Sequence, residues 1–298
     1  MTPTQKPLIS AIVVNYNVGA LLHSCIDSLL ACPLDVEVIV IDNASTDDSL
    51  DAVRSMPRVQ VVGNARNRGF AAACNQGIAL AKADNLLFLN PDCVFVPGTL
   101  AELLRPLRAD VRAGMAGGLL VNPDGSEQGG ARRAVPTPWR SFVRAFGLSR
   151  FAWRWPKLFF DFHLHKQPLP DGPIEVEAIS GACMLVKREM LAQVGPWDEA
   201  YFLHCEDLDW CMRARQNGWK VLFVPTARIT HAVGACSKSR PFFVEWHKHR
   251  GMIRFYRKFF RHQYPGVLLW LVVIGVWLRF GMVVCYHAAK RLLARMKK

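Results

Sequence analysis

The sequence predicts an α/β domain with a doubly wound parallel sheet, followed by a basic and apolar helical tail. The first observation is that short apolar runs of β-type composition alternate with segments whose apolar residues recur at helical spacing. The second is that an aspartate follows two of these runs, as is typical of ligand sites on open α/β sheets. The third is that the excess positive charge and the longest apolar stretch both lie after residue 235.

The amino-terminal part of the chain contains repeated alternations of strand and helix. Apolar runs bounded by polar or turn-forming residues indicate the strands, and the segments between them have helical periodicity or, in one case, many small residues that permit close packing. Such alternation specifies a doubly wound sheet. We expect strands at 10–17, 36–43, 59–64 and 86–92, and helices at 20–32, 49–55 and 69–83.

The second part of the body is less regular. A turn is indicated at Asp124 and Gly125. Periodicity then fails over 131–173, where aromatic residues alternate with Arg and Pro, so we expect an insertion loop there. Further elements are a helix at 99–107, a strand at 115–121, a strand and helix start in 176–191, a helix from 207 to about 218 and a strand at 220–224.

These expectations divide the chain into a body and a tail. The body covers 1–235, with halves at 1–125 and 174–235 on either side of the insertion at 131–173. The tail covers 236–298 and reads as helices.

The charge of the chain is concentrated in this tail. Residues 236–298 contain 14 Lys or Arg and one acidic residue, Glu245, whereas 1–235 are neutral. A basic tail beside a neutral body suggests a polyanionic surface, either anionic lipid or nucleic acid. The apolar stretch 265–286, which basic clusters flank, favours the membrane over nucleic acid.

The stretch 265–286 allows three interpretations. It approaches the length of a bilayer span, but Arg279 interrupts it and positive charge flanks both ends. We therefore favour an interfacial or re-entrant helix over a full span. The third interpretation is a buried core helix, because Trp270, Leu271, Ile274 and Leu278 fit a helical stripe.

The cysteines and the amino-terminal segment favour an intracellular site. Nine cysteines occur without any C-x-x-C pair, which suggests reduced thiols and no zinc knuckle. The first residues lead directly into a predicted strand and do not show the pattern of a secretory signal peptide, which is a charged start followed by a long apolar run. We expect the catalytic part to stay in the cytoplasm.

Asp42 and Asp92 follow the second and fourth strand-like runs. An unpaired buried carboxylate is costly, so neither is a natural core residue, although each could cap the turn or helix after it. Two such residues on one sheet edge favour a ligand site. No Gly-rich dinucleotide fingerprint follows the first strand and no phosphate loop occurs, which argues against a dehydrogenase or an ATPase. A nucleotide-sugar site remains.

Six motifs follow one another along about 10–235. They are VVNYN, VIVIDNASTDDS, RNRGFAAACNQGI, LFLNPDC, SGACMLVKRE and WDEAYFLHCEDLDWCMRARQNGW followed by a His. Together they resemble family 2 inverting glycosyltransferases, within which the chain is most similar to bacterial rhamnosyltransferase-type enzymes of cell-surface polysaccharide synthesis. The resemblance implies a GT-A type fold: a Rossmann-like mixed sheet flanked by helices, here with a membrane-associating tail.

The resemblance implies a donor site and a metal site in the half 1–125. Asp92 occupies the position of the D-x-D metal motif, whose first member is here Asn90, and His231 resembles the later metal-binding His of the family. Mg²⁺ or Mn²⁺ fits such oxygen-rich ligands and would neutralise a departing diphosphate. A lone His after a strand is otherwise usually structural. The residues implied to hold the nucleoside diphosphate sugar are Asn15, Tyr16, Asn17, Asp42, Arg66, Asn67, Gly69 and Asn90.

The resemblance also implies a catalytic and acceptor half at 174–235. An inverting displacement needs a base for the acceptor hydroxyl, and the family likeness points to Asp207, with Glu206 beside it orienting groups, holding acceptor or serving as the alternative base. Carboxylates at a helix start could instead only complement the helix dipole. The residues expected at the acceptor are Gly181, Trp197, Asp198 and Tyr201, for which ordinary packing is the alternative.

The resulting hypothesis is an inverting transfer of L-rhamnose from TDP-rhamnose to a lipid-linked or polysaccharide acceptor, at the cytoplasmic face of a bacterial inner membrane. The expected partners are the donor, the acceptor and an anionic membrane surface, with no nucleic acid. Another UDP- or GDP-sugar is an alternative donor. Two alternatives from other classes are a nucleotidyltransferase, whose Gly-rich basic loop is absent, and a non-catalytic membrane-tethered scaffold, against which the retained acidic and His residues speak.

Overall fold

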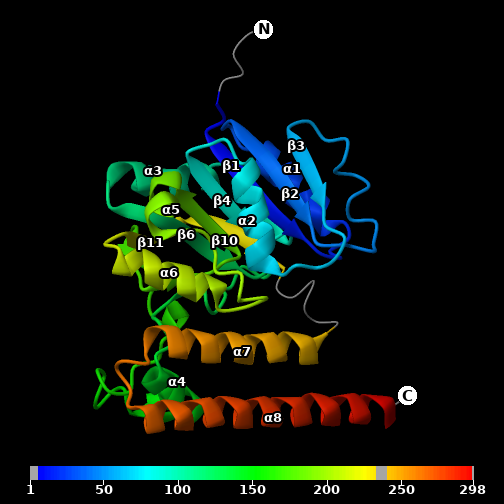
Figure 1. Ribbon diagram of the computed structural model, residues 1–298. Helices are drawn as coiled ribbons and strands as arrows, with labels where there is room; N and C mark the ends of the chain where they lie inside the picture. The colour runs from blue at the N-terminus through cyan, green and yellow to red at the C-terminus, as the bar shows by residue number, and fades with distance from the viewer. Residues whose placement is uncertain (1–5, 233–239, 297–298) are drawn as a thin grey trace. The chain divides into compact units, whose positions relative to one another are not determined.

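The computed structural model describes residues 6–232 and 240–296. These residues form two compact units (Figure 1), which we describe separately. The first unit holds the described residues of 1–135, 163–200 and 206–236, and the second those of 136–162, 201–205 and 237–298. The expected boundary between body and tail at 235/236 lies outside the described residues.

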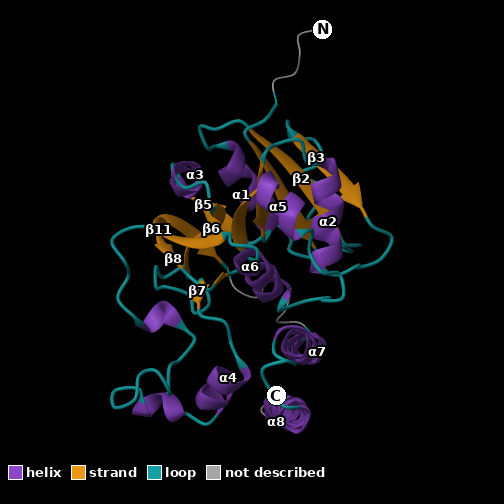
Figure 2. Cartoon of the chain, turned by 60° about the vertical axis from the view of Figure 1, so that its left-hand side comes forward, coloured by secondary structure: helices purple, strands orange, loops and turns teal. Residues whose placement is uncertain are grey.

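The first unit is built on a nine-stranded mixed sheet with helices on both faces (Figures 1 and 2). The strand order is β3-β2-β1-β4-β10-β6-β11-β5, and β8 pairs with β11. The bounds are β1 Ile9–Asn15, β2 Val36–Asp42, β3 Val59–Gly63, β4 Asn85–Leu89, β5 Cys93–Phe95, β6 Ala113–Val121, β8 Ile174–Glu175, β10 Cys183–Lys187 and β11 Lys220–His231. A separate two-stranded sheet pairs β7 Arg132–Arg133 with β9 Ala178–Ile179.

The first four strands are parallel, which brings their carboxyl ends to one edge. Every residue of β1 is buried, as expected for a strand that is covered on both faces. In the register of β1 with β2, Asn15 stands opposite Asp42, and Val13 stands opposite Leu89 of β4. The helices of this unit are α1 Leu21–Leu30, α2 Phe70–Leu80, α3 Thr99–Ala109, α5 Arg188–Val194 and α6 Glu206–Gln216.

Two expectations about the first half are wrong. The segment 49–55 forms successive turns instead of a helix, closed by bonds such as Val53 N to Leu50 O at 3.2 Å. It is short, and the Asp47 carboxylate accepts from the Ser49 hydroxyl at 2.6 Å, a local bond that competes with helix formation. The fourth strand ends at Leu89 and not at 92, because Pro91 cannot donate a ladder hydrogen bond.

The insertion at 131–173 contains more structure than the expected loop. It includes β7, the helix α4 Pro138–Ala145 and the 3₁₀ turns η1 Leu148–Phe151 and η2 Leu164–Lys166. Thr137 caps α4 by accepting from Arg140 N at 3.1 Å, and Pro138 begins the helix. The alternation of aromatic and basic residues masked these signals.

The second unit contains α4, η1 and two long helices, α7 Pro241–Phe259 and α8 Gly266–Met296. The two long helices lie side by side in Figures 1 and 2. Among the described residues, one helical segment, Gly266–Arg291, is long and apolar enough to cross a membrane, with a mean hydropathy of 2.4. Length and composition alone are weak evidence for a span.

A substitution at Gly118 tests how closely β6 and β11 pack. A Cβ on this residue of β6 would stand 2.3 Å from the carbonyl oxygen of Ala227, which is backbone in β11 and cannot rotate away. We expect Gly118→Ala to lower the free energy of unfolding by about 1–3 kcal/mol or more in urea denaturation. Gly63→Ala is the matched control, because nothing lies within 4 Å of its added Cβ. Equal stability of the two variants would contradict this packing.

Candidate active site

The carboxyl edge of the parallel strands carries a polar network around Asp42. Asn15 donates through Nδ2 to Asp42 Oδ1 at 2.8 Å and to Ser49 Oγ at 2.9 Å. Ser45 donates to the same carboxylate, from its hydroxyl at 2.6 Å and from its backbone N–H at 3.1 Å. Asp42 therefore does cap the turn that follows its strand, as the structural alternative held. The Oδ1 atom of Asn15 is buried and has no hydrogen-bond partner among the described residues, so it is available to a ligand.

The loop after β1 is held by the loop after β2. Asn17 donates its backbone N–H to Ser45 Oγ at 3.0 Å, and its side-chain oxygen accepts from Thr46 N at 2.7 Å. The backbone of Asn17 has φ 51°, a left-handed conformation that Asn tolerates better than most residues. Tyr16 is half-buried beside it. The structure thus brings Asn15, Asn17 and Asp42 together, as the sequence predicts.

A second group lies where α2 begins. Gly69 has φ 86° and caps the amino end of the helix, and Asn67 Oδ1 accepts from its N–H at 2.9 Å. Asn43 links this turn to β2 by donating to Gly69 O at 3.2 Å. Arg66 is exposed, so its guanidinium is accessible to an anionic ligand.

The predicted metal ligands are close together. His231 Nε2 lies 3.1 Å from Asp92 Oδ1, and ligand atoms of Asp92, Cys93 and His231 all lie within 4.8 Å of one another. The other ring nitrogen, Nδ1, is 2.9 Å from Gln128 Oε1, while Gln128 Nε2 donates to His231 O at 2.6 Å. Gln128 thereby fixes the ring and directs Nε2 toward Asp92, which is the arrangement of a metal-binding His.

Cys93 is the least suitable member of this group. Burial, followed by charge from neighbouring thiols and Asp92, raises the pKa of its thiol well above the usual value. The thiol points to Ala182 O at 3.4 Å. The remaining pair, a carboxylate and an imidazole, fits a divalent cation such as Mn²⁺ or Mg²⁺ that also binds phosphate oxygens. Asn90 Nδ2 is 3.4 Å from His231 Nε2, beside this pair.

Asp207 stands at the start of α6 with every carboxylate oxygen engaged. Its Oδ2 accepts from Gly181 N at 3.1 Å and forms an ion pair with Arg133, and its Oδ1 accepts from Leu208 N at 2.8 Å. A Cβ on Gly181 would stand 3.2 Å from Cβ of Asp207, which is a tight contact, so glycine lets the backbone approach this carboxylate closely.

Glu206 differs sharply from its neighbour. It is 7% exposed, and its Oε2 has no hydrogen-bond partner within the described part of the chain. Burial, followed by the charge of Asp207, raises the pKa of Glu206 to about 8. Glu206 is therefore neutral near pH 7, whereas the Asp207 carboxylate beside it is bound by the Arg133 guanidinium and the Gly181 N–H.

Two consecutive residues, Gly181 and Ala182, which we call the Gly181–Ala182 step, connect the two halves of the site through their backbone hydrogen bonds. Gly181 N binds Asp207, and the next residue, Ala182, accepts through its carbonyl from Asn90 N at 2.9 Å. Asn90 and Asp92 belong to the turn between β4 and β5, and β5 pairs with the end of β11 so that Cys93 stands opposite His231. The predicted base and the predicted metal ligands thus flank the same two residues.

The expected acceptor residues differ in their surroundings. Trp197 is 2% exposed and packs edge-to-face against Phe88 and beside Trp210 in the core of the first unit, so it offers no ring face to a sugar. That expectation is wrong, because the residue's aromatic character serves packing. Asp198 Oδ1 accepts from Ala200 N at 3.1 Å in a turn. Tyr201 belongs to the second unit, where the Arg254 guanidinium lies 5.4 Å from its ring centroid.

Several residues of the site were not predicted. Ser45 lies in a motif that the sequence singled out, and an Asx-type turn after Asp42 could have indicated its role. Gln128 and Arg133 lie at the edge of the expected insertion, and no local pattern links them to His231 and Asp207, which are 103 and 74 residues away.

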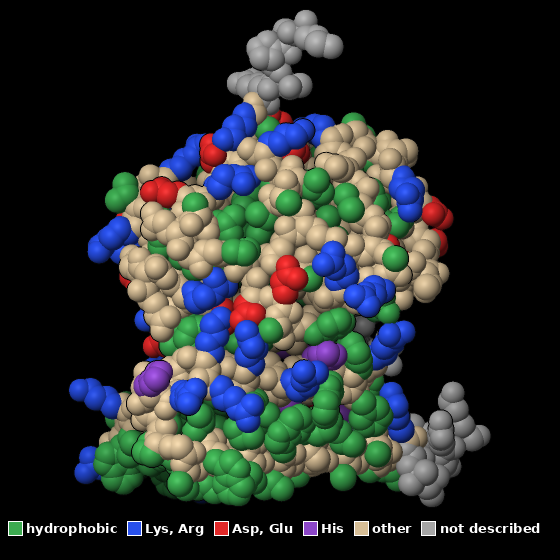
Figure 3. Space-filling model, viewed as in Figure 1, with side chains coloured by type: hydrophobic (Ala, Val, Ile, Leu, Met, Phe, Trp, Pro, Cys, Tyr) green, Lys and Arg blue, Asp and Glu red, His purple; other side chains and the backbone are tan. Residues whose placement is uncertain are grey.

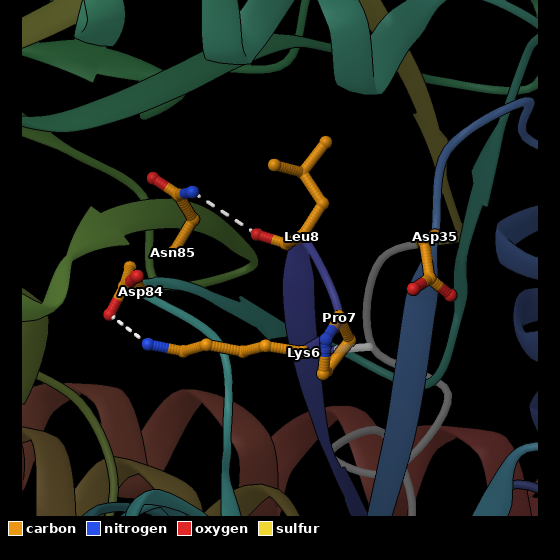
Figure 4. A pocket seen from close by; sticks show the side chains of 6 residues that line it. All are labelled: Lys6, Pro7, Leu8, Asp35, Asp84 and Asn85. Carbon is orange, nitrogen blue, oxygen red and sulfur yellow. Dashed lines mark hydrogen bonds and ion pairs between the residues drawn. The ribbon is translucent and has the colours of Figure 1, made fainter. Parts of the chain in front are cut away.

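The opposite edge of the sheet carries a small hollow (Figure 4). Lys6 and Asp84 form an ion pair at 2.6 Å across it, and Asn85 donates to Leu8 O at 3.1 Å. It lies at the amino ends of β1, β2 and β4 and contains none of the predicted site residues. Its lining residues are Lys6, Pro7, Leu8, Asp35, Asp84 and Asn85.

Comparison with solved structures identifies the fold as GT-A-like. The chain superposes with a TM-score of 0.61 and 19% identity on GalNAc-T7 in complex with UDP, GalNAc and Mn²⁺, over 85% of this chain and 48% of that one. It matches the mannosyltransferase PcManGT from Pyrobaculum calidifontis, in complex with GDP-Man and Mn²⁺, with a TM-score of 0.58 and 18% identity over 97% and 82%. The chain spans about half the length of the first of these. The fold prediction is confirmed.

The sequence comparisons narrow the class to a family. The model of glycosyl transferase family 2 matches residues 10–195, and the chain belongs to this family. A curated relative, the N-acetylglucosaminyl-diphospho-decaprenol L-rhamnosyltransferase of Mycobacterium tuberculosis, is 32% identical over 237 residues, which cover 75% of this chain and 76% of the relative. The succinoglycan biosynthesis protein ExoU of Rhizobium meliloti is 36% identical over 108 residues, 35% of this chain and 32% of that protein. The resemblance inferred from the motifs is confirmed, and the chain is a glycosyltransferase.

The raised pKa of Glu206 predicts a pH dependence of stability. Below the ordinary glutamate pKa of 4.5 the group is protonated in both states, whereas between 4.5 and about 8 the unfolded chain loses the proton that the folded chain keeps. The free energy of unfolding should therefore fall across this window, and Glu206→Gln should remove that fall, a difference of a few kcal/mol at about 1.4 kcal/mol per pKa unit.

Urea denaturation from pH 5 to 8 measures this difference, with metal chelated. The exposed Glu189 supplies the control, because Glu189→Gln should follow the wild-type profile. Parallel profiles for the wild type and Glu206→Gln would show that Glu206 is ionised in the folded protein.

Proposed function

We propose that the chain is an inverting glycosyltransferase that moves L-rhamnose from TDP-rhamnose to a lipid-linked acceptor in cell-envelope glycan synthesis. The observation that carries the proposal is the Gly181–Ala182 step, which binds Asp207 on one side and the Asn90–Asp92 turn on the other. A displacement reaction needs this proximity, because the base and the leaving group lie on opposite sides of one sugar carbon.

The donor nucleotide would lie along the carboxyl ends of β1 and β2. Asn15 offers a buried, unpartnered oxygen there, and Asp42 and Asn17 are held in place by the Ser45 contacts described above. Arg66 and the amino end of α2 at Gly69 are suited to negative charge. The mycobacterial relative, which is named a rhamnosyltransferase, supports the choice of L-rhamnose.

Asp92 and His231 would hold Mg²⁺ or Mn²⁺ at the diphosphate. When bound, the cation would supply charge stabilisation to the departing nucleoside diphosphate. The protein's own contribution is to orient the ligands: Gln128 directs His231 Nε2 toward Asp92, and Asn90 stands beside both.

Asp207 would act as the base. The acceptor oxygen forms a bond to the anomeric carbon as the bond from that carbon to the diphosphate oxygen breaks, and the electron pair of that bond leaves with the diphosphate. The acceptor proton passes to the Asp207 carboxylate. The Arg133 guanidinium and the Gly181 N–H bind the Asp207 carboxylate and hold it in place, while the neutral Glu206 avoids a second negative charge beside it.

A lipid-linked acceptor and a cytoplasmic location at a bacterial inner membrane complete the proposal. The name of the mycobacterial relative includes a diphospho-decaprenol acceptor, which supports a polyprenyl-diphosphate sugar as the acceptor class. Each cysteine of the described residues is a free thiol, in keeping with a reducing compartment.

The base assignment is tested by Asp207→Asn, which keeps shape but cannot accept the proton. We expect kcat to fall by about 10²- to 10⁴-fold, with donor affinity little changed. Glu206→Gln is the matched neighbour and should retain far more of kcat. Turnover of both variants at saturating donor and acceptor decides the matter, since a near-normal Asp207→Asn beside an inactive Glu206→Gln would reverse the assignment.

The metal site is tested through Gln128, which binds no metal itself. Gln128→Leu removes the acceptor of His231 Nδ1 and should weaken Mn²⁺ affinity by roughly 10- to 100-fold, measured by electron paramagnetic resonance titration without donor. Gln128→Glu keeps an acceptor for this nitrogen and should retain affinity. Thermal unfolding in EDTA verifies that both variants fold. Unaltered Mn²⁺ affinity in Gln128→Leu would place the cation elsewhere.

A further inference from the structure

The second unit exposes an apolar stripe along α8. Leu271, Leu278, Met282 and Tyr286 are between 52% and 67% exposed and recur at helical spacing, so they share one face of the helix. A continuous apolar face of this length on a soluble surface is unusual. Figure 3 shows it as a green belt, with blue Lys and Arg side chains beside it.

The one charge within this apolar stretch, Arg279, forms a hydrogen bond with α7. Arg279 donates from Nη1 to His249 Nε2 of α7 at 3.1 Å, and His249 Nδ1 lies 2.7 Å from the carbonyl oxygen of Glu245. His249 is fully buried, and this burial lowers its pKa, so the neutral ring can accept from Arg279. The guanidinium thus pairs with α7 and leaves the outer stripe uncharged.

Contacts continue along the two helices and tie α8 to α7. Trp246 packs against Trp277 with their ring centroids 5.2 Å apart, and the Arg291 guanidinium lies 4.6 Å from the ring centroid of Phe242. Beside these contacts, α7 carries five basic residues and one acidic residue: Lys248, Arg250, Arg254, Arg257, Lys258 and Glu245.

This pairing decides how α8 can meet a membrane. If α8 crossed the bilayer while paired, it would carry the basic residues of α7 into hydrocarbon, at a cost of at least ~2.5 kcal/mol for each charge near the centre. If it crossed alone, Arg279 would lose His249 and stand unpaired in the bilayer. A position in the interface avoids both costs, because the apolar stripe enters the lipid while α7 stays among the headgroups and water.

The helix α4 and the turn η1 extend the same surface. Trp139 and Phe142 of α4 and Phe146, which follows its last residue, are 41%, 45% and 65% exposed, and Trp153 just after η1 is 82% exposed. Tyr256 of α7 donates to Ser141 of α4 at 2.7 Å, which fixes α4 to the helical pair. In Figures 1 and 2, α4 and α8 lie on the same side of α7. Exposed Trp and Phe interspersed with Arg are typical of side chains at the lipid–water boundary.

We propose that the second unit lies on one leaflet of an anionic membrane, with α8, α4 and η1 inserted to the depth of the interface and with both ends of α8 on the same side. Anionic lipid is the partner that fits, because residues 236–298 contain 14 basic residues and one acidic residue. The proposal concerns membrane docking and does not rest on the proposed sugar transfer, so either can fail while the other holds.

Site-specific labelling tests the arrangement in the full chain. In a background with Cys236→Ser and Cys285→Ser, the remaining cysteines are buried, and single cysteines can be placed at exposed positions before and near the end of α8 as Gln263→Cys and Lys290→Cys. Asp51→Cys, exposed in the first unit, reports the cytoplasmic side. In a bacterial host, a membrane-impermeant maleimide should label all three in inverted vesicles and none in intact spheroplasts. Labelling of Lys290→Cys only from the spheroplast side would overturn the proposal.

Vesicle binding tests the aromatic part of the surface. The double variant Trp153→Ala with Trp155→Ala should lower affinity for vesicles with 30% phosphatidylglycerol by roughly 10-fold, because two interfacial anchors are lost. Val111→Ala, whose side chain is exposed in the first unit, should have no effect. Binding to neutral phosphatidylcholine vesicles should be weaker than to anionic ones. Unchanged binding of the double variant, or equal binding to both lipids, would contradict the proposed surface.

Discussion

The parallel pairing of β1 with β2, which places Asn15 beside Asp42, is the constraint on which the donor side of the site depends. A buried carboxylate is tolerated only when hydrogen bonds stabilise its charge, and Asp42 receives them from Asn15 and Ser45. Because Ser45 also binds Asn17 N, the same bonds hold the loop after β1 against the loop after β2. A shift of one residue in this register would break all of these bonds and bury an unpaired charge.

The Gly181–Ala182 step joins this edge to the remainder of the site. Its first residue binds Asp207 of α6, and its second binds Asn90 in the turn that leads to Asp92. The two carboxyl groups at the start of α6 have different partners. Asp207 forms an ion pair with Arg133 and accepts a hydrogen bond from the Gly181 N–H, whereas Glu206 is buried with an unpartnered oxygen. Burial raises the pKa of Glu206, so the two adjacent residues differ in their surroundings and in their hydrogen bonding.

The sequence was informative wherever a local pattern determines structure. The apolar runs predicted the strands that hold Asn15 and Asp42, and the ordered motifs predicted the family that the comparisons confirm. Long-range pairings such as Gln128 with His231 carry no local signal, so they appear only in the structure. Trp197 was misread because an aromatic residue has the same sequence signature in a core as in a sugar site. The roles of Asp92, His231 and Asp207 stay predictions.

The central claim is that one sheet edge binds a nucleoside diphosphate sugar through a divalent cation. Isothermal titration of TDP-rhamnose into the full chain, first with Mn²⁺ and then with excess EDTA, tests it most directly. The account predicts saturable binding with Mn²⁺ that is lost in EDTA and in Asp92→Ala. Equal binding in EDTA, or no binding of TDP-, UDP- or GDP-sugars in the presence of Mn²⁺, would contradict it.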